Sequence, residues 1–456
     1  MELLLRNTEG TLEPQSVFTK QQRIAEHARR SPQMSFTSLG YYMDLEWMRE
    51  AYRRTRKDGA TGIDGATAES YSESLEDNLK DLLERAKSGS YRAPPVRRVH
   101  ISKGTPAKET RPIGIPTFED KVLQRGVSML MEPIYEHDFL DCSYGFRPKR
   151  SAHQLLNALW KAVMEMGGGW ILEVDIRKYF DTLNHGMLRE IVRKRVCDGV
   201  LKRLIGKWLK AGVMESGNVS YPDNGTPQGG VISPLLSNIY LHEVLDTWFV
   251  QEIEPRLMGR VKLLRFADDF IILFANEADA RRVESELPKR FGQYGLTIHE
   301  EKTRLIDFRI PYVRKDNEET FDFLGFTHYW GKSRKGRWVL MRKTVSKRLT
   351  RSIKKARAWC RSNRHEPLED QRKALCRKLT GHYAYYGITG NSKCLRSYFE
   401  QVKRAWQKWL NRRSRHRDMP WERFNKLLDR YPLTTPRVIR SVHVTERNHN
   451  LRNRMP

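Results

Sequence analysis

The segment Leu263–Phe274, with the sequence LLRFADDFIILF, places two adjacent carboxylates between two apolar runs. Such runs are typical of buried strands, so we predict two short strands joined at Asp268 and Asp269. Two like charges this close resist joint ionisation unless a cation neutralises them. An ordinary hairpin is the structural alternative, but two-residue hairpin turns favour Gly or Asn over Asp. The segment therefore predicts a sheet that carries concentrated negative charge at one strand junction.

A third carboxylate, Asp175, ends the predicted strand WILEVDI, in which Ile171, Glu173 and Asp175 share one face. If the two strand regions lie side by side, Asp175, Asp268 and Asp269 form a set of hard oxygen ligands for Mg²⁺. Two such ions about 3.5–4 Å apart activate an attacking hydroxyl and stabilise the leaving group in phosphoryl transfer. We therefore expect two Mg²⁺ ions, with Mn²⁺ as a substitute. A solvated aspartate at a strand end is the alternative for Asp175 alone.

Strand and helix signals alternate from Arg111 to Gly325, which predicts an α+β core. Around it we expect weakly patterned polar sequence up to about residue 40 and a helical, basic region after Gly331. The other expected elements are helices over 41–57 and 71–87, the second ending at Gly89, a strand over 96–102, a helix that begins with Ser233 as N-cap and Pro234 in its first turn, and breaks near 365–367, 387–390 and 419–420.

The positive charge of the chain is concentrated at its end. The formal net charge is +28, and residues 331–456 hold 35 Lys and Arg against 8 Asp and Glu, a net charge of +27. The first 330 residues hold 48 basic and 47 acidic groups. The positive charges of this region repel one another, and a polyanionic partner would neutralise them. We therefore predict a charge-balanced body with a nucleic-acid-binding C-terminal region.

Cysteine spacing and hydropathy indicate in which cellular compartment the protein is expected. The five cysteines form no C-x-x-C pair, so we expect scattered thiols and neither a disulfide framework nor a zinc module. No stretch is long and apolar enough to span a bilayer, and the N-terminal apolar run is too short for a signal peptide. We therefore expect a soluble, cytoplasmic protein without a membrane partner.

Two further motifs suit a nucleotide site. Tyr179 and Phe180 follow Asp175, and a ring beneath the sugar of a nucleotide would exclude a 2′-hydroxyl and favour dNTPs. Core packing is an equal interpretation for Tyr179. The segment GTPQGGVISP combines glycines that permit close backbone approach with Gln228, which offers both a donor and an acceptor. A simple turn before a helix is the alternative for this segment.

Seven blocks in order resemble those of group II intron-encoded reverse transcriptases, which are also maturases. The blocks are RPIGIP, SYGFRP, VDIRKYFDTLNH, GTPQGGVISPLLSNIYL, RFADD, GLTIHEEKT and FLGF. The resemblance implies a right-hand polymerase with fingers, an antiparallel palm sheet and a helical thumb. It implies an N-terminal extension over 1–57, fingers and palm over 58–330, a thumb and maturase (domain X-like) region over 331–415, and a small basic DNA-binding region over 416–456.

The same resemblance implies roles for individual residues. Asp175, Asp268 and Asp269 correspond to the catalytic carboxylates, and Ile176 joins them as a metal-binding position. Phe180 resembles the aromatic residue that excludes a 2′-hydroxyl, with Tyr179 beside it, and Gln228 resembles the glutamine of the nucleotide pocket. Lys103 and Arg111 would hold the triphosphate, with Lys108 as an equal candidate for Lys103.

The basic region interleaves cations with aromatic residues at helical spacing, which suits phosphate contacts from one face and packing from another. We expect the RNA-binding residues to be Arg342, Lys343, Lys347, Arg348, Arg351, Lys354, Lys355, Lys403, Arg404, Arg412 and Arg413. The segment GHYAYYGI, with His382, Tyr383, Tyr385 and Tyr386, resembles a maturase signature, although packing is an equal interpretation. For each single helix, a solvated basic face is the alternative.

The chain departs from the family pattern in two places. Phe266 stands where Tyr is commonest before Ala-Asp-Asp, and we expect activity to survive because that ring only packs beside the metals. No Cys-pair or His-Asn-His nuclease cassette follows the basic region, so we expect a form without the HNH endonuclease that takes its primer elsewhere, such as from a replication fork.

The resemblance predicts an RNA-directed DNA polymerase that copies intron RNA and assists splicing and mobility, with intron RNA, a DNA target and primer, and dNTPs as partners. A splicing-only maturase and a reverse transcriptase recruited to host defence are the alternatives. The oligomeric state stays open.

Overall fold

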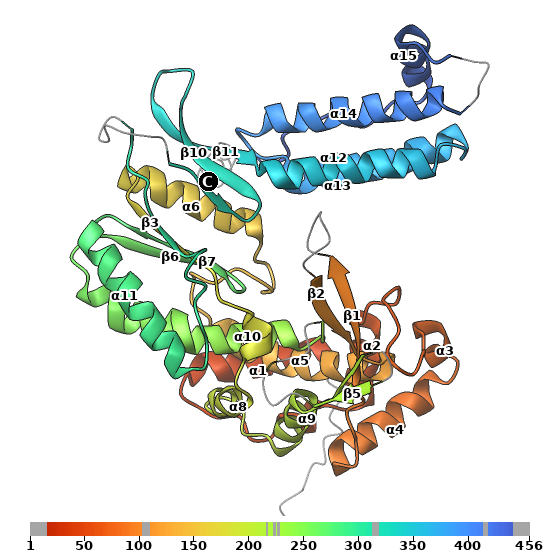
Figure 1. The fold of residues 1–456 in the computed structure, drawn as a ribbon. Coiled ribbons are helices and arrows are strands. Elements are labelled where there is room, and N and C mark those ends of the chain that lie inside the picture. Colours follow the sequence, from red (N-terminus) through yellow and green to blue (C-terminus); the bar gives the residue numbers. More distant parts are fainter. Residues whose placement is uncertain are drawn as a thin grey trace, which may run out of the picture. The chain divides into compact units, whose positions relative to one another are not determined.

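The computed structural model describes residues 16–102, 110–215, 218–221, 225, 229–311, 319–413 and 418–440. The chain divides into two compact units, whose helices and strands are labelled in Figure 1. Unit 1 comprises residues 1–155 and 172–305, and unit 2 comprises residues 156–171 and 306–456. Among the described helices, none is both long and apolar enough to cross a bilayer. All five cysteines carry free thiols.

Helices and strands alternate along the chain, which confirms the α+β class. The described helices are α1 (Val17–Arg30), the 3-10 turn η1 (Leu39–Tyr42), α2 (Leu45–Arg54), α3 (Ala68–Ser72), α4 (Leu75–Ser88), α5 (Phe118–Asp138), α6 (Ala152–Met166), α7 (Tyr179–Thr182), α8 (His185–Arg193), α9 (Gly199–Leu209), α10 (Ser233–Leu241), the π-helical turns η2 (His242–Thr247) and η3 (Phe249–Ile253), the 3-10 turn η4 (Glu254–Arg256), α11 (Glu277–Gln293), α12 (Ser346–Ser362), α13 (Leu368–Tyr386), α14 (Ser392–Asn411) and α15 (Trp421–Arg430). The described strands are β1 (Val96–Ser102), β2 (Thr110–Ile115), β3 (Trp170–Val174), β4 (Val213–Glu215), β5 (Asn218–Ser220), β6 (Val261–Phe266), β7 (Asp269–Phe274), β8 (Arg304–Asp307), β9 (Phe321–Phe323), β10 (Phe326–Lys332) and β11 (Trp338–Thr344).

The strands form three sheets. One has the order β2-β1-β4-β5, in which β1 runs antiparallel to β2 and parallel to β4. A second has the order β6-β7-β3-β8, with β6 and β7 antiparallel. The third, in unit 2, has the order β11-β10-β9 and is antiparallel throughout. The second sheet places β3, which precedes Asp175, beside β7, which begins at Asp269.

Local chemistry explains several helix ends. Gly89 terminates α4 as expected, because its φ of +90° is a conformation that side chains disfavour. The helix α10 also begins where Ser233 and Pro234 predict, but Ile232 occupies the N-cap position and Ser233 is already helical, so the capping role of Ser233 was wrong. Beyond α10 the chain continues as the π-helical turns η2 and η3, a rare geometry that often accompanies functional sites.

The segment before residue 40 is more ordered than its sequence pattern predicts, because α1 lies within it. Ser16 caps α1 by accepting a hydrogen bond from the Thr19 N–H, and Ile24 and Ala28 are buried one turn apart. The pattern is obscured by Lys20, which is buried and forms an ion pair with Asp44. A buried lysine breaks the apolar period that sequence analysis relies on.

Unit 2 keeps strand character beyond Gly331, so the expectation that helical structure begins there was wrong. The hairpin of β10 and β11 runs to Thr344, and α12 starts at Ser346. The breaks expected near 365–367, 387–390 and 419–420 are confirmed by the gaps between α12, α13, α14 and α15.

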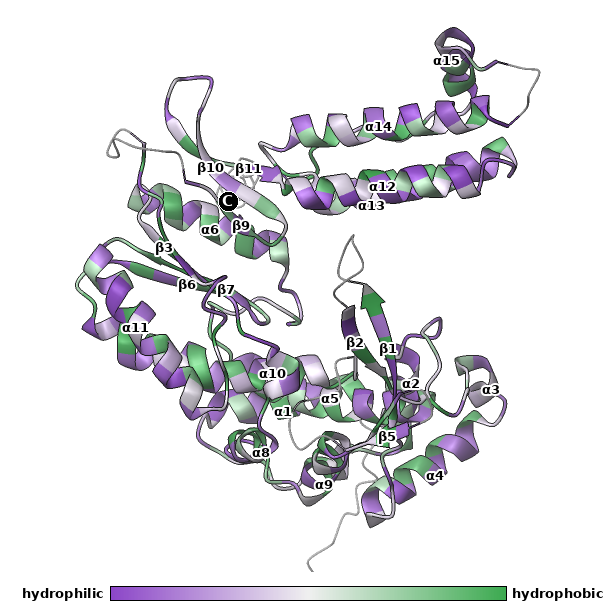
Figure 2. Ribbon diagram, in the orientation of Figure 1, coloured by the Kyte–Doolittle hydropathy of each residue, from purple (hydrophilic) through white to green (hydrophobic). Residues whose placement is uncertain are grey.

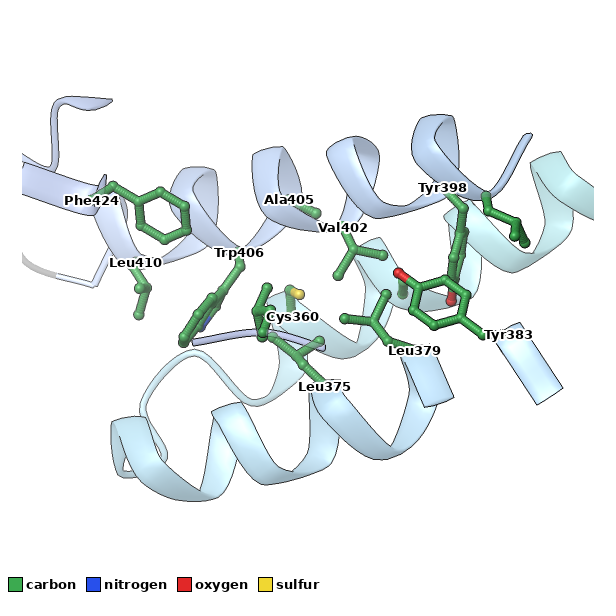
Figure 3. Packing of buried hydrophobic residues seen from close by; sticks show 13 residues of the cluster. Cys360, Leu375, Leu379, Tyr383, Tyr398, Val402, Ala405, Trp406, Leu410 and Phe424 are labelled. Carbon is green, nitrogen blue, oxygen red and sulfur yellow. The ribbon is translucent and has the colours of Figure 1, made fainter. Parts of the chain in front are cut away.

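Helices α12, α13, α14 and α15 of unit 2 share an apolar core, shown in Figure 3. Trp406 of α14 is fully buried, and its indole N–H donates to Gln371 Oε1 of α13 at 2.9 Å. Cys360 of α12 and Leu379 of α13 lie in the same cluster. Figure 2 shows hydrophilic and hydrophobic residues alternating along α12–α14, as amphipathic helices require.

Candidate active site

The hairpin of β6 and β7 carries two of the three predicted carboxylates. Its last paired residues are Phe266 and Asp269, so the two-residue turn consists of Ala267 and Asp268 instead of the two aspartates. Ala267 has a φ of +58°, a left-handed conformation that costs about 1–3 kcal/mol for a residue with a side chain. Such strain concentrates where a side chain must be presented in a fixed direction. Here it presents Asp268, which is half-buried, next to Asp269, which is exposed.

The loop that contains the SYGFRP block supports this turn from one side. The Tyr144 N–H donates to Arg265 O at 2.9 Å, and the Arg265 N–H donates to Cys142 O at 2.8 Å. A Cβ atom added to Gly145 would lie 2.3 Å from the backbone nitrogen of Ala267. Gly145 is therefore required for this close approach, and the loop and turn form one packed arrangement.

The side chain of Arg265 fixes the turn from beneath. It is fully buried and forms a two-pronged ion pair with Asp246, with Nε to Oδ1 at 2.8 Å and Nη2 to Oδ2 at 2.5 Å. It also donates to the Ala267 carbonyl oxygen and to Asn238 Oδ1, both at 3.0 Å, and to Ser143 Oγ at 2.8 Å. The guanidinium thus joins the turn to three separate segments, with each donor satisfied.

Asp175 follows the end of β3 and is half-buried. Its carbonyl oxygen accepts from the His299 N–H at 2.8 Å, and the Arg177 N–H donates to Thr297 O at the same distance. Its carboxylate is paired with a lysine, since Lys302 Nζ lies 2.8 Å from Oδ2. The segment 297–303, which includes the HEEKT sequence, therefore holds both the backbone and the side chain of Asp175.

Electrostatics show which charged groups lie close to Asp268. Burial raises the pKa of its carboxyl above the ordinary value, and the charge of Asp175 raises it further. A backbone hydrogen bond and the positive charges of Arg111 and Arg265 lower the pKa of the same group. Asp175 and Arg111 are thus near enough to influence Asp268, so the structure brings together two predicted catalytic carboxylates and one predicted triphosphate ligand.

The donor chemistry of these residues fits a divalent cation, although the ligands are not gathered in advance. Carboxylate oxygens are the ligands that Mg²⁺ prefers, and the ammonium of Lys302 already occupies a cation position beside Asp175. The hydrocarbon side chain of Ile176 is buried and has no ligand atom, so only its backbone carbonyl could serve as a ligand. Within the described part of the chain, no three His, Cys, Asp or Glu side chains are arranged as a ready metal site.

The two aromatic residues after Asp175 have different surroundings. Tyr179 is 2% exposed, and its hydroxyl donates to Ser237 O at 2.9 Å. Burial raises the pKa of this hydroxyl. Phe180 is half-buried and meets Tyr179 edge to face, with 5.2 Å between the ring centroids. Tyr179 thus packs in the core, and Phe180 is the less buried of the two rings.

Two glycines fix the ends of the GTPQGG segment. A Cβ atom added to Gly225 would lie 2.8 Å from Phe180 O, and one added to Gly229 would lie 2.5 Å from Gly114 O. Both glycines also have positive φ, +92° and +121°. Gly225 therefore lies against the backbone of Phe180, and Gly229 lies against β2, the strand that carries Arg111 opposite Ile101. Gln228, Lys103 and Lys108 lie outside the described residues.

Two residues that sequence reasoning missed help to build this site. Arg265 could have been noticed, because a lone arginine inside an apolar strand needs a buried partner. Lys302 gave no comparable signal, since it stands in the charged segment HEEKT.

The predicted RNA-binding residues of unit 2 are mostly on the surface. Lys343, Lys347, Arg348, Arg351, Lys354, Lys355, Arg404, Arg412 and Arg413 are exposed, and Lys403 is half-buried. Arg342 differs, because it is 2% exposed and donates to Leu156 O at 3.3 Å. Burial also lowers its pKa to about 10. A buried guanidinium cannot reach a phosphate, so Arg342 has a structural role inside unit 2 and does not bind RNA as expected.

The residues of the GHYAYYGI segment pack within unit 2. His382 stacks on Tyr398 with 3.9 Å between ring centroids, and the hydroxyl of Tyr385 donates to Leu324 O at 2.8 Å. Tyr383 is 1% exposed in the helical core. The packing interpretation accounts for these contacts.

A family profile described as "Reverse transcriptase (RNA-dependent DNA polymerase)" matches residues 101–328. The matched range includes Asp175, Asp268, Asp269 and Arg111. Protein YkfC of Escherichia coli (strain K12) is 33% identical over 352 residues, which cover 69% of this chain and 89% of that protein.

Two more relatives have names that refer to introns. The group II intron-encoded protein LtrA of Lactococcus lactis subsp. cremoris is 39% identical over 235 residues, or 50% of this chain and 38% of LtrA. A mitochondrial protein of Arabidopsis thaliana named nuclear intron maturase 2 is 26% identical over 175 residues, or 30% of this chain and 24% of that protein. The matches thus span well under two thirds of both intron-related proteins.

Proposed function

The chain belongs to the reverse transcriptases, the RNA-dependent DNA polymerases, and from this premise we propose that it serves a group II intron. It copies the intron RNA into DNA and, as a maturase, assists splicing and mobility. The observation that carries the catalytic part is the sheet order β6-β7-β3-β8, because it places the end of β3, which Asp175 follows, beside β7, whose turn with β6 carries Asp268 and Asp269. The intron part is supported by the similarity to LtrA and to an intron maturase.

The proposed architecture is that of a right hand. Residues 58–330 form fingers and palm, with the β6-β7-β3-β8 sheet as the palm sheet. Residues 331–415 form the thumb and maturase region, and residues 416–456 form a small DNA-binding region. Residues 1–57 form an N-terminal extension.

Asp175, Asp268 and Asp269, with the Ile176 carbonyl, would hold two Mg²⁺ ions. Bound there, the ions supply charge neutralisation and activation of the primer 3′-hydroxyl. Because Lys302 is paired with Asp175, this lysine must withdraw from the carboxylate when the ions bind.

The remaining groups position the nucleotide. Arg111 binds the triphosphate as a planar fork, and Lys103 adds a point charge. Phe180 lies beneath the sugar and excludes a 2′-hydroxyl, while Gln228 approaches the nucleotide from the segment held by Gly225 and Gly229. Among the described residues, Arg265 has no hydrogen bond to Arg111 or Phe180, and it acts as a positioning residue through the Ala267 carbonyl.

The exposed cations of α12 and α14 bind the phosphates of the intron RNA. The apolar faces of α12 and α14 pack in the core of unit 2, so their basic faces are exposed and available to bind a polyanion. A splicing-only maturase is the alternative function. The retention of Asp175, Asp268 and Asp269, each within a supporting local structure, favours an active polymerase.

Primer extension tests the proposal. Purified protein with an RNA template, an annealed DNA primer, dNTPs and Mg²⁺ should extend the primer, and Asp268→Ala should abolish extension. The control variant is Asp58→Ala, which removes an exposed carboxylate whose one ion-pair partner among the described residues is Arg56, and it should leave extension unchanged. Extension by Asp268→Ala at the wild-type rate would show that the carboxylates have been assigned wrongly.

A splicing assay tests the proposed maturase activity separately. The wild-type protein should accelerate splicing of its cognate intron RNA at a low Mg²⁺ concentration that does not support self-splicing. Asp268→Ala should retain this acceleration, because RNA binding lies elsewhere in the chain.

A further inference from the structure

Helices α8 and α9 concentrate positive charge in a part of the chain that is otherwise close to neutral. Residues 185–210 hold 8 Lys and Arg against 2 Asp and Glu, a net charge of +6. The other 304 of the first 330 residues sum to −5. The apparent charge balance of the N-terminal region therefore hides a strongly basic segment.

Two adjoining hollows open on this basic segment, within unit 1. Their volumes are about 420 and 350 Å³, and both are lined by Arg189, Lys202 and Arg203. Further basic lining residues are Arg92, Arg193, Lys207 and Lys210. Among the described residues that line the two hollows, none is acidic. Seven cations around one concave surface create a local positive potential that attracts anions.

Some of these cations have structural partners. Arg203 Nη2 donates to Lys87 O at 3.0 Å, and Lys207 Nζ donates to Gly89 O at 2.6 Å. Both satisfy carbonyl groups at the C-terminal end of α4, where cations are favourable. Arg193 donates to Glu190 Oε1 at 3.0 Å.

The remaining four cations of the two hollows have no such structural partners among the described residues. The side chains of Arg92, Arg189, Lys202 and Lys210 have no hydrogen-bond or ion-pair partner among the described residues. Three of them are exposed, and Lys202 is half-buried. Within the described part of the chain, these four charges therefore take no part in an internal hydrogen bond or ion pair.

An aromatic side chain lies beside these cations. Tyr221 lines the larger hollow, is 71% exposed and rests against Gly212, where an added Cβ atom would lie 2.9 Å from the tyrosine ring. An exposed ring next to unpaired cations is the combination with which proteins bind single strands, because bases stack on the ring while cations meet the phosphates.

We propose that the basic groove formed by Arg92, Arg189, Lys202, Lys210 and Tyr221 binds a single-stranded segment of RNA. This inference rests on the proposed function only in taking nucleic acid as the partner. Duplex RNA fits less well, because its paired bases are stacked internally and cannot reach Tyr221. The groove is a second RNA-binding surface, built on α8 and α9 and independent of the basic helices of unit 2.

Lysine acetylation of the full chain tests the proposal directly. A 20-nucleotide unpaired RNA should slow acetylation of Lys202 and Lys210 about fivefold or more at low salt, and this protection should fade as salt rises. Lys289 on α11 is the internal control, since it is exposed and, within the described ranges, its ammonium pairs only with Glu286. Equal protection of Lys202, Lys210 and Lys289, or none at all, would overturn the proposal.

Competing ligands distinguish the source of the negative charge. Inorganic phosphate, RNA duplex and poly-glutamate of matched charge should each protect Lys202 and Lys210 much less than the single strand. Equal protection by duplex RNA would overturn the single-strand assignment. Equal protection by poly-glutamate would indicate an acidic protein partner instead, and equal protection by phosphate would indicate a simple anion site.

A matched pair of variants adds a binding readout. The triple variant Arg189→Gln, Lys202→Gln and Lys210→Gln should lower the dependence of log affinity on log salt for single-stranded RNA by about 2, since each lost phosphate contact contributes about 0.7. The control triple variant Arg281→Gln, Arg282→Gln and Lys289→Gln makes the same charge change on α11 and should leave the slope nearly unchanged. Tyr221→Ala should weaken binding about tenfold without changing the slope.

Primer extension separates this inference from the proposed function. If the wild-type chain extends a primer but its groove lysines are not protected, only the groove proposal fails. If the lysines are protected but no primer is extended, the groove proposal stands and the polymerase proposal fails.

Discussion

The hairpin of β6 and β7 and the helices α12–α14 both present charged side chains, but they are held in opposite ways. Beneath the hairpin, Arg265 and Asp246 are fully buried, and polar bonds tie the turn to separate segments. Beneath the basic helices, Trp406 and Leu379 lie in an apolar core, and the cations stay in solvent. Charge is placed inside the first region and excluded from the interior of the second.

The difference follows from what each region has to do. Hydrogen bonds and ion pairs are directional, so a network of them fixes the position of Asp268, as catalysis requires. Apolar packing is non-directional and fixes only which face of a helix is exposed. That is sufficient for a surface that neutralises phosphates, because such binding depends mainly on the number of charges.

Removing the buried cation should have the largest effect on stability. Arg265→Met leaves Asp246 buried without its partner, and breaking such a pair costs about 3–5 kcal/mol of unfolding free energy. Arg265→Lys should cost less, because it keeps the charge but loses the bidentate fork. Chemical denaturation measures both variants. A loss below about 1 kcal/mol for Arg265→Met would show that the hairpin does not depend on this network.

The pH dependence of stability should have opposite signs in the two units. Burial raises the pKa of Asp120 in unit 1 to about 6 from an ordinary 3.8, while hydrogen bonds from Tyr91, Trp208 and Gln124 lower it. Folding therefore favours the protonated form. This contribution, about 3 kcal/mol, is complete below pH 4 and is lost as the pH rises through 6. Asp120→Asn should remove that loss in denaturation curves recorded between pH 4 and 7.

His382 in unit 2 provides the matching case. Burial lowers its pKa to about 4 from an ordinary 6.5, so folding favours the neutral ring. Its contribution is present above pH 6.5 and is lost as the pH falls through 4. His382→Phe should remove this acid sensitivity. If either variant keeps the pH dependence of the wild type, the titration must be assigned to another group.

Removing exposed cations from α12 should change binding more than folding. The variant with Lys347, Arg351, Lys354 and Lys355 replaced by Gln should lose about a hundredfold in RNA affinity at moderate salt. Its unfolding free energy should change by less than about 1 kcal/mol, since none of the four side chains is buried. Filter binding and denaturation together measure the two effects. Comparable losses in both would contradict the separation between packing and charge.

Sequence patterns predicted the parts of this structure that depend on near neighbours. The apolar runs around Asp268 predicted β6 and β7, and Gly89 predicted the end of α4, because each signal lies within a few residues. The network around Arg265 was not predictable in the same way, since Asp246 and Ser143 are 19 and 122 positions away. A partner at such a distance leaves no local pattern.

Charge counting failed in a related way. Arg342 was expected to bind RNA because it stands in a basic segment, but the β10–β11 hairpin places it inside unit 2. Conversely, the near-zero net charge of the first 330 residues concealed the basic groove on α8 and α9. Total charge predicts a polyanionic partner, whereas the fold decides which cations can reach it.

The most direct test measures binding and extension together on Asp268→Asn, a variant that keeps the shape of the side chain but removes its charge. The assay uses an RNA template annealed to a DNA primer, with the protein in excess. The account predicts that the affinity for this duplex stays within about twofold of the wild type, while the extension rate falls by a factor on the order of a thousand or more. Extension at a rate near that of the wild type would contradict the central claim that the carboxylates at the β6–β7 turn catalyse DNA synthesis.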